Sequence, residues 1–292
     1  MELLLVMLNN YQEYIIDNLN NLISFDNKKI TLITDKKFDQ YFLKFNINIV
    51  YIEDLDANYT NYIKSINNTF RKGFWYLASY RFNAISKYMK KYNSTNILHI
   101  ENDVMLYKNI QNINFHATNK ILITMDTRNR CIPGIVFIPN YLLLEQCLDN
   151  FIQEKNDMEN FAICYNKLKI IDTLPIINKI NTQNLSVDFL NKNFNHYNAI
   201  FDAAAIGQYL GGIDPRNNPN ETRGFINETC LVDYSKYKFV WINENNLYIP
   251  HIIIDNTLVP IVNLHIHSKY LGKFLAYNPI ENKLIEKTHT LS

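Results

Sequence analysis

The sequence predicts an α/β fold in which a mostly parallel central sheet is flanked by helices. Over the first hundred of its 292 residues, short apolar runs of strand length alternate with segments that repeat apolar residues at helical spacing. A second observation is the apolar run over residues 97–106, which is interrupted by Glu101-Asn102-Asp103. Parallel sheets bind ligands beyond the carboxyl ends of their strands, so acidic residues at such an end predict a binding site.

The elements of the first half follow this pattern in order. Strands are expected over residues 3–8, 29–34, 48–52 and 97–106. Residues 11–23 and 61–92 carry apolar side chains at helical spacing, and the longer segment is expected to form one helix, or two that break near Gly73. Strands that alternate with helices imply a parallel sheet with helices on both faces.

The second half mixes both kinds of element. Strands are expected over residues 121–125, 135–138, 239–242, 248–254 and 259–266, with a turn at 131–134. Helices are expected over residues 141–153, 158–168 and 200–212, the last of them closed by two glycines. Residues 173–198 show no clear pattern. We expect one domain over residues 1–292.

The composition excludes several classes of protein. With 29 Lys and Arg against 28 Asp and Glu, the net charge of +1 creates no field that would attract nucleic acid or anionic lipid. No secretory signal and no apolar run of about 20 residues is present, so we expect no transmembrane segment and a cytoplasmic location, in a cell or a virus-infected host. The four cysteines lack metal-site or disulfide-framework spacing and are expected to be buried thiols.

The acidic triplet needs a physical reason, because an ionised carboxylate costs several kcal/mol to bury unless it is paired or bound to a cation. On a strand, Glu101 and Asp103 would point to the same side, where they could hold one divalent cation through oxygen. The alternative is a polar turn between two strands, which Asn and Asp favour. Taken alone, the triplet fits both interpretations equally well.

A second group of candidate ligands lies near the C-terminus. His265 and His267 are two residues apart on a strand-like run, so both could face one metal site. Lys269 and Lys273 follow, and a cation-rich strand end suits a diphosphate. The alternative is a pair of ordinary core or surface histidines.

Together these features resemble glycosyltransferases of the GT-A fold, which bind a nucleotide-sugar through Mn²⁺ held by an Asp-x-Asp-type motif. Glu101-Asn102-Asp103 stands where that motif would stand, after its apolar strand. The resemblance implies a Rossmann-like mixed, mostly parallel sheet, with residues 1–140 as the nucleotide-binding half and 141–292 as the acceptor-binding half. It further implies Mn²⁺ (or Mg²⁺) as cofactor.

The same resemblance implies roles for particular residues. Asp103 would be the principal metal ligand, assisted by Glu101 and by His265 or His267, and Lys269 or Lys273 would contact phosphate. The remaining nucleotide-sugar contacts would come from the early strand, the helix before the motif and the motif itself: Thr34, Asp35, Arg81, Glu101 and Asn102.

Residues 201–212 are the best candidates for the acceptor side. Asp202 and Gln208 could bind sugar hydroxyls, and the small residues 203–205 would let a ligand approach the backbone. In an inverting enzyme Asp202 would be the general base; in a retaining enzyme it would position substrate or stabilise the oxocarbenium ion. An N-cap role for Asp202 is the alternative.

The sequence therefore predicts a metal-dependent transfer of a sugar from a nucleoside diphosphate donor to a hydroxyl of a glycan, lipid or protein acceptor. A UDP-sugar is preferred as donor because metal-dependent members of the resembled family mostly use one. A nucleotidylyltransferase would need a glycine-rich loop after the first strand, and residues 8–11 contain no glycine. The second candidate is a catalytically inactive carbohydrate- or nucleotide-binding protein on a GT-A-like fold.

Overall fold

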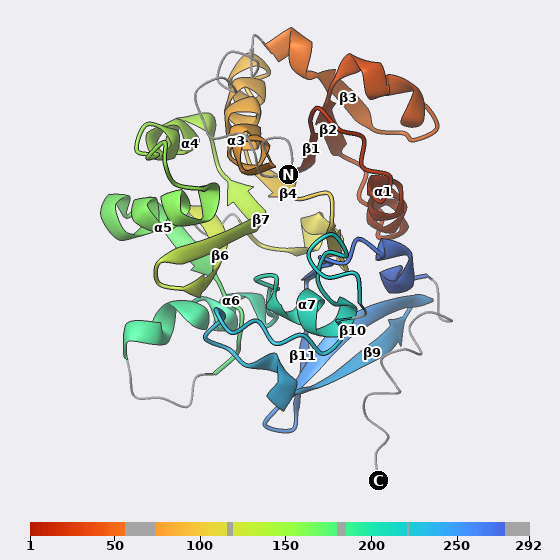
Figure 1. Ribbon diagram of the computed structural model, residues 1–292, viewed down its shortest axis with the longest axis vertical. Coiled ribbons are helices and arrows are strands. Elements are labelled where there is room, and N and C mark those ends of the chain that lie inside the picture. The colour runs from red at the N-terminus through yellow and green to blue at the C-terminus, as the bar shows by residue number, and fades with distance from the viewer. Residues whose placement is uncertain (56–73, 116–118, 180–184, 221, 278–292) are drawn as a thin grey trace.

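The computed structural model has a seven-stranded mixed sheet. The sheet lies at the centre of the molecule (Figure 1). The structure describes residues 1–55, 74–115, 119–179, 185–220 and 222–277. The strand order of the sheet is β3-β2-β1-β4-β7-β6-β8. The strands are β1 (Glu2–Met7), β2 (Ile30–Thr34), β3 (Asn48–Tyr51), β4 (Ile97–Ile100), β6 (Ile121–Thr127), β7 (Arg130–Ile138) and β8 (Ile171–Leu174). Neighbouring strands are parallel except for β7, which is antiparallel to β4 and β6. The predicted mixed, mostly parallel sheet is confirmed.

Helices cover both faces of this sheet (Figure 1). Helix α1 (Ile15–Ser24) packs on one face, and α3 (Phe74–Lys91), α4 (Tyr141–Leu148) and α5 (Asp157–Leu168) pack on the other. Strand β1 shows why both faces are apolar: Leu3 and Leu5 belong to the core under α1, while Leu4 and Val6 belong to the core under α3. Because side chains alternate along a strand, a run of consecutive apolar residues serves two cores at once.

Two smaller sheets complete the fold. Strands β9 (Lys238–Glu244), β10 (Leu247–Ile254) and β11 (Thr257–Pro260) form an antiparallel sheet, and β5 (Val104–Leu106) pairs antiparallel with β12 (Asn263–His265). Short helices α6 (Phe194–Tyr197) and α7 (Ala205–Gly211) follow β8 and precede β9 in the sequence. Short 3₁₀ helices span Lys36–Tyr41, Ile52–Leu55, Ile110–Asn112, Leu185–Leu190, Tyr234–Lys236 and Leu271–Phe274. The β5–β12 pair brings the late histidines beside the acidic triplet.

Several predicted elements need correction. The strand expected over residues 259–266 is divided between β11 and β12, which belong to different sheets. The strand expected over residues 97–106 is two strands, because the triplet forms a turn in which the Val104 N–H donates to the Glu101 carbonyl at 3.0 Å. The turn expected at 131–134 is wrong: these residues lie within β7, where a bulge opposite Ile123 and Thr124 accommodates Pro133. The hairpin turn lies instead between Thr127 and Arg130.

The helix expected over 200–212 is shorter than predicted. It begins at Ala205, since Ile200 bridges to Ile261 and Ala204 adopts a left-handed conformation with φ of 64°. The helical pattern over residues 61–73 lies outside the described residues, and the rest of that pattern is α3. The four cysteines are buried thiols. None of the helices in the described ranges is long and apolar enough to cross a membrane.

Candidate metal and anion site

The Glu101–Asp103 turn is anchored by asparagines rather than by a strand. One edge of β5 pairs with β12, and on its other side the amide of Asn18 in α1 donates to the carbonyls of Asn102 and Val104, each at 3.0 Å. Asn102 is itself buried, and its amide donates to the Val6 carbonyl at 2.9 Å and to Gln12 Oε1 at 2.7 Å. Buried backbone carbonyls need hydrogen-bond donors, and here the side-chain amides of Asn18 and Asn102 supply them in place of a neighbouring strand. The side chain of Asn102 therefore ties the turn to the end of β1.

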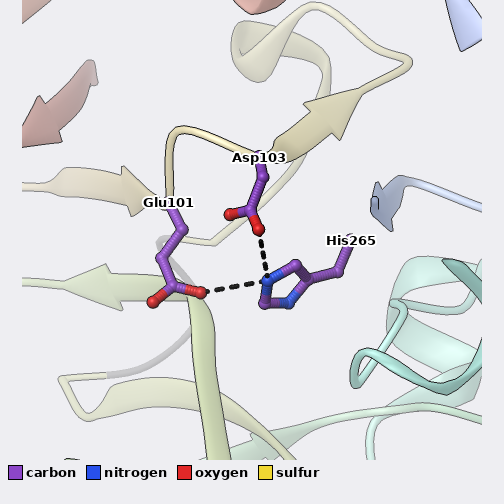
Figure 2. Close-up of side chains that lie close together, drawn as sticks. All are labelled: Glu101, Asp103 and His265. Atoms are coloured by element: carbon purple, nitrogen blue, oxygen red, sulfur yellow. Dashed lines mark ion pairs between the residues drawn. The ribbon is translucent and has the colours of Figure 1, made fainter. Parts of the chain in front are cut away.

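The two carboxylates of the turn converge on His265 (Figure 2). His265 Nε2 lies 3.2 Å from Glu101 Oε2 and 3.4 Å from Asp103 Oδ2. One ligand atom from each of the three residues lies within 4.8 Å of the others. Two carboxylate oxygens with one imidazole nitrogen form a donor set that suits Mn²⁺ and is acceptable to Mg²⁺. The sequence analysis predicted this convergence on the assumption that Glu101 and Asp103 lie on one strand. In the structure the two residues lie in the turn between β4 and β5, and this turn brings their side chains together.

The backbone of His265 is held by Asp202. Asp202 Oδ2 accepts hydrogen bonds from the N–H groups of His265 at 2.9 Å and Gly207 at 2.8 Å, and Oδ1 accepts one from Ile206 at 2.9 Å. Burial raises the pKa of Asp202, and these N–H groups oppose that shift. The buried carboxylate thus accepts hydrogen bonds from the first turn of α7 and from β12, so both of its oxygens already serve as acceptors.

Arg81 lies in the core of the site and connects two acids. Its guanidinium contacts Glu101 Oε1 at 2.7 Å and Asp157 Oδ2 at 3.0 Å, and it donates to the Pro133 carbonyl at 3.1 Å. The Arg81 and Asp157 side chains are only 8% and 3% exposed, so the pair is shielded from water. The resemblance assigned Arg81 to the nucleotide, whereas in the structure its guanidinium forms an ion pair with Glu101 and orients that carboxylate.

The structure distinguishes the two candidate lysines. Lys269 forms an ion pair with Asp103 Oδ2, and its ammonium lies 5.5 Å from the centre of the Tyr14 ring. Lys273 is exposed and lies over the ring of Tyr270, at 5.3 Å. Lys269 is therefore the lysine that the fold brings to the acidic turn.

The charges at this turn shift one another's ionisation. Burial alone would raise the pKa of Asp103, but Lys269 and His265 beside it hold that pKa well below its ordinary value. Burial would lower the pKa of His265, yet the facing carboxylates of Asp103 and Glu101 raise it. The His265 ring and the Lys269 ammonium thus face the two carboxylates and offset part of their charge.

His267 occupies a different position from His265. The two rings lie 4.5 Å apart between centroids, and His267 Nδ1 lies 2.8 Å from Gln208 Nε2. Burial, together with His265 and Lys269, holds the pKa of His267 well below its ordinary value, so the ring is neutral. Among the described residues the carboxylate cluster includes His265 and not His267. Gln208 Oε1 and Ser268 Oγ are buried without a hydrogen-bond partner in the described part of the chain.

Thr34 and Asp35 lie at the same edge of the sheet as the triplet. Thr34 ends β2 and Asp35 follows it. Strand β2 is separated from β4 by β1, and all three strands are parallel. Asp35 Oδ2 accepts a hydrogen bond from the Asn9 N–H at 2.6 Å. The buried hydroxyl of Thr34 has no partner within the described ranges. This edge therefore offers polar groups on both sides of the β1 end.

Sequence reasoning missed several residues of the site. Tyr14 precedes α1, and burial together with the charges of Asp103 and Glu101 raises its pKa well above the ordinary value. Asp157 and Asn18 were also missed, although Asn18 interrupts the apolar stripe of α1, which is a usable signal. Arg216 pairs with Asp214 at 2.6 Å, and Arg216 lowers the pKa of Asp214 to about 2 against the opposing effect of burial.

No protein-family model matches the sequence, and no curated protein is similar to it. Solved structures that match include mouse xyloside xylosyltransferase 1, at 11% identity over 60% of this chain and 84% of that chain, with a TM-score of 0.39. The glycosyltransferase GlyE of Streptococcus pneumoniae TIGR4 matches at 12% over 80% and 62%, with a TM-score of 0.39. A cytidylyltransferase from Leptospira borgpetersenii matches at 10% over 67% and 87%, with a TM-score of 0.38. Likeness of this degree carries no argument about reaction or substrate.

Proposed function

We propose that this protein is a metal-dependent glycosyltransferase that moves a sugar from a nucleoside diphosphate donor, with a UDP-sugar as first choice, to a hydroxyl of a glycan, lipid or protein. One observation carries the proposal: Glu101, Asp103 and His265 converge at the carboxyl end of a central strand, with Lys269 beside them. A mixed carboxylate and imidazole set beside a lysine suits a divalent cation together with a diphosphate.

The chemistry follows from the charge that develops as the sugar leaves. Glycosyl transfer needs the departing diphosphate to be neutralised, and a divalent cation, when bound by Asp103, Glu101 and His265, supplies this charge stabilisation. Lys269, whose side chain is 25% exposed, would donate to phosphate oxygens beside the same turn. Arg81 and Asp202 would keep Glu101 and His265 in place without touching the donor.

The remaining assignments rest on position and on unpaired polar atoms. Thr34 and Asp35, at the end of β2, are the candidates for the nucleoside. The unpaired Oε1 of Gln208 and the neutral ring of His267 are the candidates for hydroxyls of the sugar or the acceptor. The occupied oxygens of Asp202 speak against a role as general base, since a base needs an oxygen within reach of the acceptor hydroxyl.

The direct test is a thermal-shift titration with UDP, GDP and their common sugar conjugates, each with Mn²⁺ and then with excess EDTA. We expect a UDP species to stabilise the protein and the chelator to abolish most of that stabilisation. Hydrolysis of one conjugate would identify the donor sugar. Stabilisation by a nucleotide-sugar without turnover on any acceptor would favour the catalytically inactive binding protein, and the absence of any nucleotide effect would refute the proposal.

A further inference from the structure

We propose that Lys269 and a divalent cation compete for Asp103, and that a nucleoside diphosphate relieves this competition, so that cation and anion bind cooperatively. The proposal rests on the proposed function and concerns the regulation of the same site. In this proposal Lys269 has two roles. Its ammonium is the counter-ion of Asp103 when no anion is bound, and it contacts the phosphate when one is bound.

A single oxygen of Asp103 has two nitrogen partners. The Lys269 ammonium pairs with Asp103 Oδ2, and the same oxygen lies 3.4 Å from His265 Nε2. The Asp103 side chain is only 8% exposed, so little water is available to serve as a substitute partner. The oxygen of Asp103 that faces His265 is the one that Lys269 occupies, so a cation placed among Glu101, Asp103 and His265 would share this carboxylate with the Lys269 ammonium.

An ammonium and a divalent cation on one buried oxygen repel each other strongly, because the surrounding protein screens charge less than water does. Lys269 is able to move away from Asp103, because its side chain is 25% exposed and its four-carbon stem is flexible. Arg216 is a second cation whose charge interacts with Asp103, and it pairs with Asp214 at 2.6 Å. A diphosphate bound here would attract Lys269 and release Asp103 for the cation.

Cooperativity follows by linkage. If the diphosphate raises the affinity for the cation by removing a competitor, the cation must raise the affinity for the diphosphate by the same factor. Couplings of this kind are typically about 5- to 150-fold. Without the Lys269 ammonium the competition disappears, so the cation alone should bind more tightly while the coupling shrinks.

The test compares Lys269→Met with Lys273→Met, a matched control that removes the same charge from an exposed lysine placed over Tyr270. Mn²⁺ affinity is measured by electron paramagnetic resonance at one fixed pH, first without any nucleotide. Lys269→Met should bind Mn²⁺ about tenfold more tightly than the unaltered protein, as expected for removal of one charge-assisted contact. Lys273→Met should be unchanged, and Lys269→Gln should repeat the result of Lys269→Met.

The second measurement is UDP affinity by calorimetry, with and without saturating Mn²⁺. The unaltered protein should show strong coupling between the two ligands, and Lys269→Met should lose most of it while also binding UDP more weakly. Equal Mn²⁺ affinity in all variants would overturn the competition and leave the metal site standing. If neither the unaltered protein nor any variant binds Mn²⁺, with or without UDP, both the metal site of the proposed function and the competition are refuted.

Discussion

Replacement of Arg81 by Met offers the sharpest test of how the site is built. The Arg81 guanidinium forms ion pairs with two carboxylates, Glu101 at 2.7 Å and Asp157 at 3.0 Å. Methionine keeps an apolar side chain of similar length but removes the positive charge. Removing one partner of a buried ion pair costs about 3–5 kcal/mol, because the remaining charge stays buried without compensation. Asp157 is 3% exposed and should incur most of this cost, whereas Glu101 is 25% exposed and is partly solvated.

We therefore expect Arg81→Met to lower the free energy of unfolding by about 3 kcal/mol, measured by urea denaturation followed by circular dichroism. The double variant Arg81→Met/Asp157→Asn removes the stranded charge as well, and should recover at least half of that loss. A residual deficit of about 1 kcal/mol is expected from the hydrogen bond to the Pro133 carbonyl.

The outcome that would refute this reasoning is specific. If Arg81→Met costs less than about 1 kcal/mol, the pair behaves like a solvent-exposed ion pair and Arg81 does not organise the site. If the double variant is no more stable than Arg81→Met, the cost does not come from the stranded charge of Asp157. Arg81→Lys is the matched control: it keeps the positive charge but lacks the planar fork, so it should be intermediate.

Three further predictions concern single residues. Asp103→Asn should retain the far-ultraviolet circular dichroism spectrum and lose Mn²⁺-dependent stabilisation by UDP; normal stabilisation would refute the ligand assignment. Asp202→Asn should weaken Mn²⁺ binding, because it disturbs the hydrogen bond to the His265 backbone; turnover that falls while Mn²⁺ affinity is unchanged would restore Asp202 as a general base. The pKa of the buried His99 is lowered to about 3 from 6.5, mainly by burial. As pH falls below 6.5, His99 binds a proton in the unfolded state but not in the folded state. The free energy of unfolding should therefore decrease by up to about 5 kcal/mol towards pH 3. The variant His99→Gln should lack that part of the pH dependence.

The class of fold and the position of the acidic residues could be predicted from the amino-acid sequence. Consecutive apolar residues in β1 could be interpreted as a doubly covered strand, because alternate side chains must enter two cores. Glu101 and Asp103 could be singled out for a related reason: carboxylates that follow an apolar strand need compensation. Both inferences concern neighbours in sequence, whose relative geometry the backbone restricts to a few possibilities.

The distant residues that complete the site could not be predicted in this way, because they are brought together by the packing of the whole chain. His265 rather than His267 meets the carboxylates because β12 pairs antiparallel with β5, with His265 opposite Val104. Lys269 reaches Asp103 across 166 residues of sequence, while Lys273, four residues later, lies over Tyr270. Strand register and loop path set these contacts, and both depend on how the whole chain packs, so the spacing of residues within a motif could not reveal them.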